Sequence, residues 1–293
     1  MKLWLAALER AASRSHDEYK SRVVLYFLPR FETVALLDIA KSDVVRWRDD
    51  LLERVSAATV NTCMGTLSSA FSWFVDQSYI PANPCNRIKP AKHIAKVFPW
   101  LQTSDGITRL LSACADNIRT IVAMLVGTGL RLDEALHLRW DDIDLDHRII
   151  IVHRGRRGAP KSGRMRHVPI FDSVLPVLRE MKLDRGENAM LWPGAKPDRP
   201  LGQTSVRKPF KAAVKRADLP PTLRLHDLRH TFASLYLADG GDLFKLARIL
   251  GHSSVKITER TYAHLMPTAF EADYGRVRFR MPSAAPVAML HAV

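Results

Sequence analysis

The sequence has few cysteines, no long apolar run and a shortage of acidic residues. Its 293 residues include only 3 cysteines, Cys63, Cys85 and Cys114. Because they are odd in number and widely spaced, we expect neither a disulfide framework nor a cysteine-rich zinc site, but a reducing compartment. The longest apolar stretch, near Ile121 to Val126, is too short to span a bilayer. The N-terminal residues, beginning Met1 to Trp4, lack the apolar core and small-residue cleavage site of a signal peptide, so we expect no secretion.

Positive charge dominates the composition. Lysine and arginine total 44 against 30 acidic residues, a formal net charge of +14. Hydrophobic residues make up 47% and charged residues 25%, the balance of a folded protein, and the length suits one large or two modest domains. The excess charge favours a polyanionic partner, either nucleic acid or an anionic surface, without choosing between them.

A basic, proline-containing stretch from Asn86 to Leu101 predicts a linker and a domain boundary near Ala95. We therefore expect a first domain over 1–95, a second over 96–275 and a tail over 276–293. The linker cations are Arg87, Lys89, Lys92 and Lys96.

The first domain has a helical pattern. An apolar stripe at spacings of four and three residues predicts a long helix that Ser56 or Thr59 could cap. Its members are Val60, Met64, Leu67, Phe71 and Phe74. A helix over 42–52 precedes it, so we expect a small bundle in which Phe71 and Phe74 are core residues.

In the second domain a hairpin stands out. The β-branched run 149–152 and the segment 167–170 predict two strands joined by a glycine-rich loop, after an acidic, turn-rich segment over 140–146. The hairpin cations are Arg154, Arg156, Arg157, Lys161, Arg164 and Arg166. Such a concentration of positive charge suits a nearby polyanion, although an ordinary solvated loop is the alternative.

A second feature is the segment G-T-G-L-R-L-D-E-A-L at 127–136. Gly127 and Gly129 are expected to break an apolar helix, and Arg131 then stands where a new helix begins. Backbone N–H groups at a helix start favour an anion, and a guanidinium there could hold a phosphate.

Two further clusters lie near the end of the second domain. In H-D-L-R-H, His226, Arg229 and His230 lie on the side opposite the apolar residues, which suits an oxyanion better than zinc. By itself, His230 is interpreted as a satisfied histidine on the polar face of the helix. His252 follows a predicted helix over 243–250 that Gly251 ends, and Tyr262 lies ten residues further on.

Taken together, these pieces resemble the tyrosine recombinase, or phage integrase, family. They are G-T-G-L-R-L-D-E-A-L, P-K-S-G-R-M-R-H-V-P-I, H-D-L-R-H-T-F-A-S, L-G-H-S-S and T-Y-A-H-L, in the order of the family. The resemblance implies a catalytic set of Arg131, Lys161, His226, Arg229, His252 and the nucleophile Tyr262. The loop before Lys161 is long for the family, so Arg164 or Arg157 are alternatives there. Glu134 and Asp227 would orient the arginines and histidines.

The resemblance also implies a fold. It is mainly α-helical with a small β-hairpin or sheet, a two-domain clamp in which the N-terminal bundle binds core-site DNA and a mixed α/β domain is catalytic. Expected DNA-binding residues are Arg87, Lys89, Lys92, Lys96, Arg156, Arg157 and Arg164. Expected partners are double-stranded DNA, a homo-tetramer on paired sites and accessory DNA-bending proteins, in the cytoplasm of a bacterial cell near its nucleoid. No metal, other cofactor or membrane is implied.

The implied reaction is strand exchange. Tyr262 would attack a backbone phosphate to form a 3′-phosphotyrosyl bond, with His226 as base and Lys161 as the acid that protonates the departing 5′-oxygen. Arg131 and Arg229 would neutralise the phosphate oxygens, and His252 would add a hydrogen bond. The alternatives are a type-IB topoisomerase and a non-catalytic DNA-binding regulator. The apolar end of the tail suits docking on a neighbouring protomer or a frayed terminus equally well.

Overall fold

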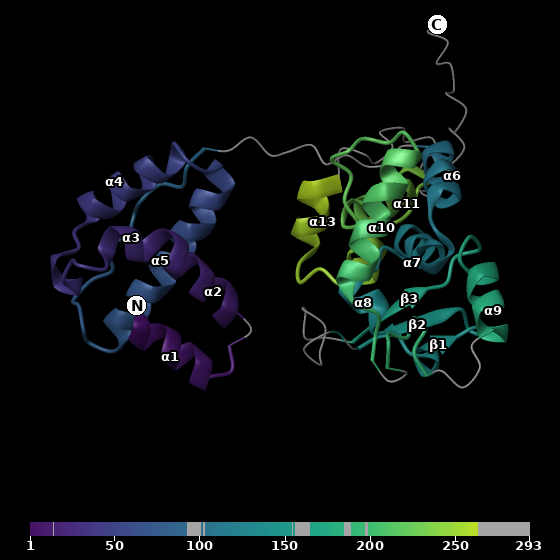
Figure 1. Cartoon of the computed structure of the whole chain (residues 1–293), viewed down its shortest axis with the longest axis horizontal. Helices are drawn as coiled ribbons and strands as arrows, with labels where there is room; N and C mark the ends of the chain where they lie inside the picture. Colours follow the sequence, from purple (N-terminus) through teal and green to yellow (C-terminus); the bar gives the residue numbers. More distant parts are fainter. Residues whose placement is uncertain are drawn as a thin grey trace, which may run out of the picture. The chain divides into compact units, whose positions relative to one another are not determined.

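The computed structural model describes residues 1–13, 15–92, 101, 103–153, 155, 165–184, 189–196 and 199–262 (Figure 1). The chain forms two compact units, Met1–Lys96 and Val97–Val293. The described elements are mostly helices, with one small sheet in the second unit, as the sequence predicts. Within these ranges, every helix falls short of the length and apolar character that crossing a bilayer requires.

The first unit is a helical bundle. Its helices are α1 (Lys2–Arg10), α2 (His16–Arg22), a π-helical stretch (Val23–Phe27), α3 (Leu28–Phe31), a 3-10 turn (Leu36–Asp38), α4 (Lys41–Leu52) and α5 (Ala57–Asp76). Of the two candidate caps of α5, Ser56 is the one: its hydroxyl accepts a hydrogen bond from the Thr59 amide. Phe71 and Phe74 are buried in a core that they share with Trp47 of α4, as predicted.

The basic segment after α5 begins on this bundle. The Asn61 side chain donates to the carbonyl of Ala91 at 2.9 Å and accepts from its amide at 2.8 Å. Arg48 of α4 donates to the carbonyl of Lys89 at 3.1 Å. The side chains of Arg87, Lys89 and Lys92 are exposed. The backbone of 89–91 is therefore held by α4 and α5, while its cations face solvent. Residues 93–100 lie outside the described residues.

The second unit combines helices with the sheet. Its described elements are α6 (Ser104–Ala113), α7 (Asp116–Thr128), α8 (Leu132–Leu136), a 3-10 turn (Trp140–Asp142), β1 (Ile143–Asp144), β2 (Ile149–Val152), β3 (Arg166–Pro169), α9 (Leu175–Leu183), α10 (Gln203–Arg216), α11 (Asp227–Ala238), α12 (Leu243–Leu250) and α13 (Val255–Tyr262).

The sheet contains the predicted hairpin and one strand more. β2 and β3 are antiparallel with Ile150 opposite Val168, and β1 joins the other edge of β2. The segment 140–146, predicted as turn-rich, thus contributes a short strand, because Ile143 is buried and pairs with Ile150. β3 begins at Arg166, one residue before the predicted start.

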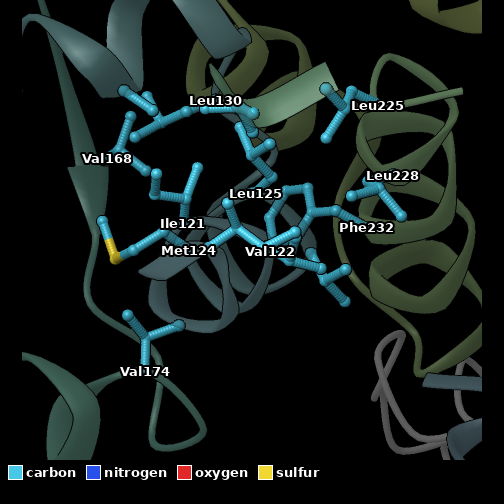
Figure 2. Packing of buried hydrophobic residues seen from close by; sticks show 14 of the residues in the cluster. Ile121, Val122, Met124, Leu125, Leu130, Val168, Val174, Leu225, Leu228 and Phe232 are labelled. Atoms are coloured by element: carbon cyan, nitrogen blue, oxygen red, sulfur yellow. The ribbon is translucent and has the colours of Figure 1, made fainter. Parts of the chain in front are cut away.

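Helix α7 is the centre of the second core. Figure 2 shows its side chains between Val168 of β3 and Phe232 of α11. The helix runs through Thr128, so the prediction that Gly127 breaks it was wrong. A Cβ at Gly127 would lie 2.2 Å from Val174 Cγ2, which explains glycine there by close packing rather than by helix termination.

Candidate active site

Gly129 places Arg131 at the edge of the core. It ends α7 in the left-handed conformation (φ +67°), and a Cβ there would lie 2.4 Å from Phe232 Cδ1 and 2.9 Å from Leu250 Cδ2. Only glycine meets both demands. The chain then extends through Arg131, which is the N-cap residue of the short helix α8.

Glu134 holds Arg131 in place. Its carboxylate accepts hydrogen bonds from the Arg131 amide and from Arg131 Nη1, both at 2.9 Å. It also accepts a two-pronged contact from Arg166, at 3.0 and 2.7 Å. Burial alone raises the pKa of Glu134, but the hydrogen bonds and charges of the two arginines outweigh it and lower that pKa to about 2. Glu134 is therefore ionised, and its two contacts hold the Arg131 backbone and guanidinium.

Arg229 lies within electrostatic range of Arg131 and Glu134. It is buried in α11, donating from Nη1 to the carbonyl of Gly129 at 2.7 Å and from Nη2 to the carbonyl of Leu250. Burial and the Arg131 charge lower the pKa of Arg229 to about 9, so the guanidinium stays positive at neutral pH. Both carbonyls are at helix ends, where backbone acceptors lack helical partners.

His252 occupies the turn after α12. Gly251 ends that helix in the left-handed conformation (φ +66°), as predicted. The ring Nδ1 lies 2.7 Å from the Thr258 hydroxyl, which leaves Nε2 as the nitrogen that can reach a ligand. Burial and the positive charges of Arg229 and Arg131 lower the pKa of His252 to about 4, so the ring is neutral at pH 7.

Tyr262, at the end of α13, meets His230 of α11. The hydroxyl lies 2.6 Å from His230 Nδ1, and only 3% of Tyr262 is exposed. Burial raises the pKa of Tyr262 to about 12, partly offset by the Arg229 charge. Burial and the neighbouring His226 lower the pKa of His230 to about 4. A neutral imidazole therefore faces a protonated phenol. The sequence analysis interpreted His230 as a satisfied histidine on the polar face of a helix and did not predict this contact.

His226 and Asp227 begin α11. The His226 ring stands perpendicular to that of His230, with centroids 5.4 Å apart. Burial, Arg229 and Arg131 lower the pKa of His226. The described contact of the Tyr262 hydroxyl is to His230, not His226. The buried Asp227 carboxylate accepts from the Arg224 amide and guanidinium, at 2.8, 3.2 and 2.9 Å.

Several predicted residues lie outside the described residues. They are Lys161, its alternatives Arg164 and Arg157, the DNA-binding candidates Arg156 and Lys96, and the tail 276–293. Among the described residues, histidines, cysteines and acidic residues form no group of three that could hold a metal ion. The described site instead brings together three arginines, two of which bind the ionised Glu134 carboxylate, and three histidines. This arrangement is suited to binding a phosphodiester.

The model of the phage integrase family matches residues 101–268, which include every residue of this site. The chain belongs to the phage integrase family. The resemblance drawn from the motifs is thereby confirmed. Phage integrases of the tyrosine recombinase type are DNA strand-exchange enzymes, and the activity of this chain is site-specific DNA recombination.

Relatives and solved structures agree with this membership. The chain is 28% identical over 235 residues to tyrosine recombinase XerC of Xanthomonas axonopodis pv. citri (strain 306), covering 76% of this chain and 74% of that one. It is 27% identical to tyrosine recombinase XerC of Xylella fastidiosa (strain M23), covering 76% and 77%.

The fold is similar to that of the Tn1549 transposon integrase in complex with a circular intermediate DNA. The TM-score is 0.76 at 22% identity, covering 90% of this chain and 94% of that one. A lambda integrase dimer bound to a COC′ core site gives 0.70 at 22% identity, covering 88% and 96%. At this identity the likeness shows the integrase fold, mainly helical with a small sheet, as predicted.

Proposed function

We propose that Tyr262 is the nucleophile of this recombinase and becomes joined to the 3′-phosphate of a cleaved DNA strand. The supporting observation is the position of its hydroxyl, 2.6 Å from His230 and within the electrostatic range of Arg229. The oxygen of Tyr262 forms a bond to phosphorus, and the bond from phosphorus to the 5′-oxygen breaks. The phosphodiester energy stays in the new linkage, so a 5′-hydroxyl can reverse the step without ATP.

Arg131 and Arg229 neutralise the non-bridging oxygens of the scissile phosphate in this proposal. Their guanidiniums are fixed by different partners, Arg131 by Glu134 and Arg229 by two backbone carbonyls. A site held in this way needs little rearrangement as charge develops in the transition state. His252 donates a further hydrogen bond from Nε2, because Nδ1 already faces Thr258.

The proton of Tyr262 passes to a histidine. His226 is the base that the family resemblance implies, whereas the hydrogen bond favours His230 as the first acceptor. Before DNA binds, burial and, after it, the surrounding positive charges keep the pKa of both histidines low. An arriving phosphate carries the opposite charge and raises them, which prepares a histidine for the proton. Lys161, or Arg164 or Arg157 in its place, protonates the 5′-oxygen.

The first unit is the proposed core-site DNA-binding domain. Its exposed cations Arg87, Lys89 and Lys92 lie in or next to the backbone segment 89–91, which α4 and α5 hold in place. Lys96, Arg156, Arg157 and Arg164 complete the proposed contacts. The substrate is double-stranded DNA. A lambda integrase tetramer bound to a Holliday junction is among the similar structures, which supports a homo-tetramer on paired sites for this chain. Accessory DNA-bending proteins and work at a bacterial nucleoid stay predictions.

Covalent trapping tests the nucleophile. A nicked suicide substrate loses its leaving strand after cleavage, so the phosphotyrosyl complex accumulates and migrates slowly on a denaturing gel. We expect the complex with the unaltered chain and none with Tyr262→Phe. Tyr236→Phe is the matched control, since that ring packs on Phe171 and Phe232. A complex that persists in Tyr262→Phe contradicts the proposal. Relaxation of supercoiled DNA lacking a recombination site would instead indicate a topoisomerase.

A further inference from the structure

Arg166 is buried beside the proposed active site, yet the mechanism above gives it no part. Arg166 is the first residue of β3 and is only 8% exposed. Nη1 and Nη2 contact the two carboxylate oxygens of Glu134, and Nε donates to the carbonyl of Ile249 at 2.8 Å. Because each guanidinium nitrogen has a protein partner, Arg166 is suited to holding neighbouring groups rather than to binding the phosphate itself.

Through Glu134, Arg166 is connected to Arg131. Each carboxylate oxygen of Glu134 accepts one hydrogen bond from Arg166 and one from Arg131. The fork of a guanidinium fixes both the position and the plane of a carboxylate. The orientation of the Glu134 carboxylate, and through it that of the Arg131 guanidinium, therefore depends on Arg166.

Arg166 also contacts the end of α12, just before His252. Ile249 lies in the last turn of α12, and its carbonyl accepts from Arg166 Nε. The Arg166 chain also covers Gly251: a Cβ there would lie 2.8 Å from Arg166 Cδ and 3.0 Å from Nε. Arg229 binds the intervening carbonyl of Leu250. The turn that carries His252 is thus held by two guanidiniums, from β3 and from α11.

We propose that Arg166 is a positioning residue that sets the placement of Arg131 relative to His252 for strand cleavage. The inference rests on the proposed function, because it assumes that both residues act on the scissile phosphate. Lysine cannot replace Arg166 in this role: its single nitrogen keeps the charge but cannot bind both carboxylate oxygens and the Ile249 carbonyl in the same geometry.

The test compares two nicked suicide substrates, one with a natural scissile phosphate and one with an uncharged methylphosphonate at that position. For Arg166→Lys we expect covalent complex formation to slow by about tenfold or more on the phosphate, with a smaller deficit on the methylphosphonate, which lacks the charge that Arg131 neutralises. Arg148→Lys is the matched control, since Arg148 contacts Asp172 at the surface, and should match the unaltered chain on both substrates.

The ratio of the two rates decides the outcome, because it does not depend on the fraction of folded protein. A deficit equal on both substrates, or none on the phosphate, overturns the positioning role. Gly251→Ala, which presses a methyl group onto Arg166 Cδ, should shift the ratio in the same direction and replaces Arg166→Lys if that variant does not fold. Failure of the unaltered chain to form any complex would instead contradict the proposed function.

Discussion

The hydroxyl of Tyr262 and Nδ1 of His230 lie 2.6 Å apart and join the end of α13 to α11. Both side chains are neutral at pH 7, since burial raises the pKa of the phenol to about 12 while burial and His226 lower that of the imidazole to about 4. Without DNA, the nucleophile is therefore held as a protonated phenol against a neutral acceptor.

Replacement of His230 tests the importance of this contact. We expect His230→Ala to slow formation of the covalent complex in single-turnover assays by about 10²-fold, a typical contribution of a positioned proton acceptor. His230→Gln retains an acceptor atom and should lose less. His147→Ala is the control, because that ring is 78% exposed and contacts Asp144 outside the site. Cleavage at the unaltered rate in His230→Ala, together with its loss in His226→Ala, would assign the proton to His226.

Removal of the Glu134 charge should destabilise the second unit. The carboxylate is 3% exposed and lies between the half-buried Arg131 and the buried Arg166, so Glu134→Gln leaves both cations without their counterion. We expect the free energy of unfolding to fall by about 3–5 kcal/mol, as when one partner of a buried ion pair is removed. Urea denaturation measures it. Asp172→Asn, at an exposed ion pair, should cost no more than about 1 kcal/mol. Equal losses in the two variants would contradict this reading of Glu134.

Much of the site could be predicted from local pattern. The helix-ending glycines Gly129 and Gly251 mark the turns before Arg131 and His252, and both adopt the left-handed conformation that such turns require. The spacing of apolar residues predicted the long helix α5, because that helix buries one face. The β-branched run 149–152 and the glycine-rich loop after it predicted the strands β2 and β3.

The contacts that could not be predicted depend on tertiary packing. His230 has the spacing of an ordinary helical residue, and only the fold brings it to Tyr262, 32 positions away. Arg166 looked like one more cation of the hairpin, although its alternation with Val168 and Ile170 places it on the buried face of β3. Gly127 could be read as a helix breaker because the close approach of Val174 leaves no trace in local sequence.

Acid should weaken the fold through the half-buried histidines His230 and His252. The pKa values of His230 and His252 are lowered from 6.5 to about 4 in the folded chain. The unfolded chain therefore binds more protons between those values, so stability falls as the pH drops through this range. Thermal melting followed across it should show a declining melting temperature, with a shallower decline in the double variant His230→Asn and His252→Asn. Glu134 contributes no decline until the pH falls below its ordinary value of 4.5. An unchanged slope in the double variant would refute the assignment.

DNA binding should take up protons. A phosphate that enters the site adds negative charge near His226, His230 and His252, whose pKa values are lowered in the free chain by burial and by the surrounding arginines. Their pKa values rise on binding, so the complex holds more protons than its separate components at about pH 6, and affinity increases as the pH falls toward that value. Calorimetry in buffers of different ionisation enthalpy measures the uptake. Proton uptake should be absent at about pH 8, where these histidines are neutral both in the free chain and in the complex. Proton release on binding at about pH 6 would contradict the prediction.

The exposed cations of the first unit should determine part of the salt dependence of DNA binding. Arg87 and Lys89 are exposed and follow α5 on a backbone that Arg48 and Asn61 hold in place. Each phosphate that a cation neutralises releases condensed counterions, which contributes about 0.9 to the slope of log affinity against log salt. If both contact phosphates, Arg87→Gln with Lys89→Gln should lower the slope by about 2 and weaken binding to all sequences alike. The matched control replaces the exposed Arg148 and Lys182 of the second unit by glutamine. An unchanged slope in the first variant would remove these two residues from the DNA interface.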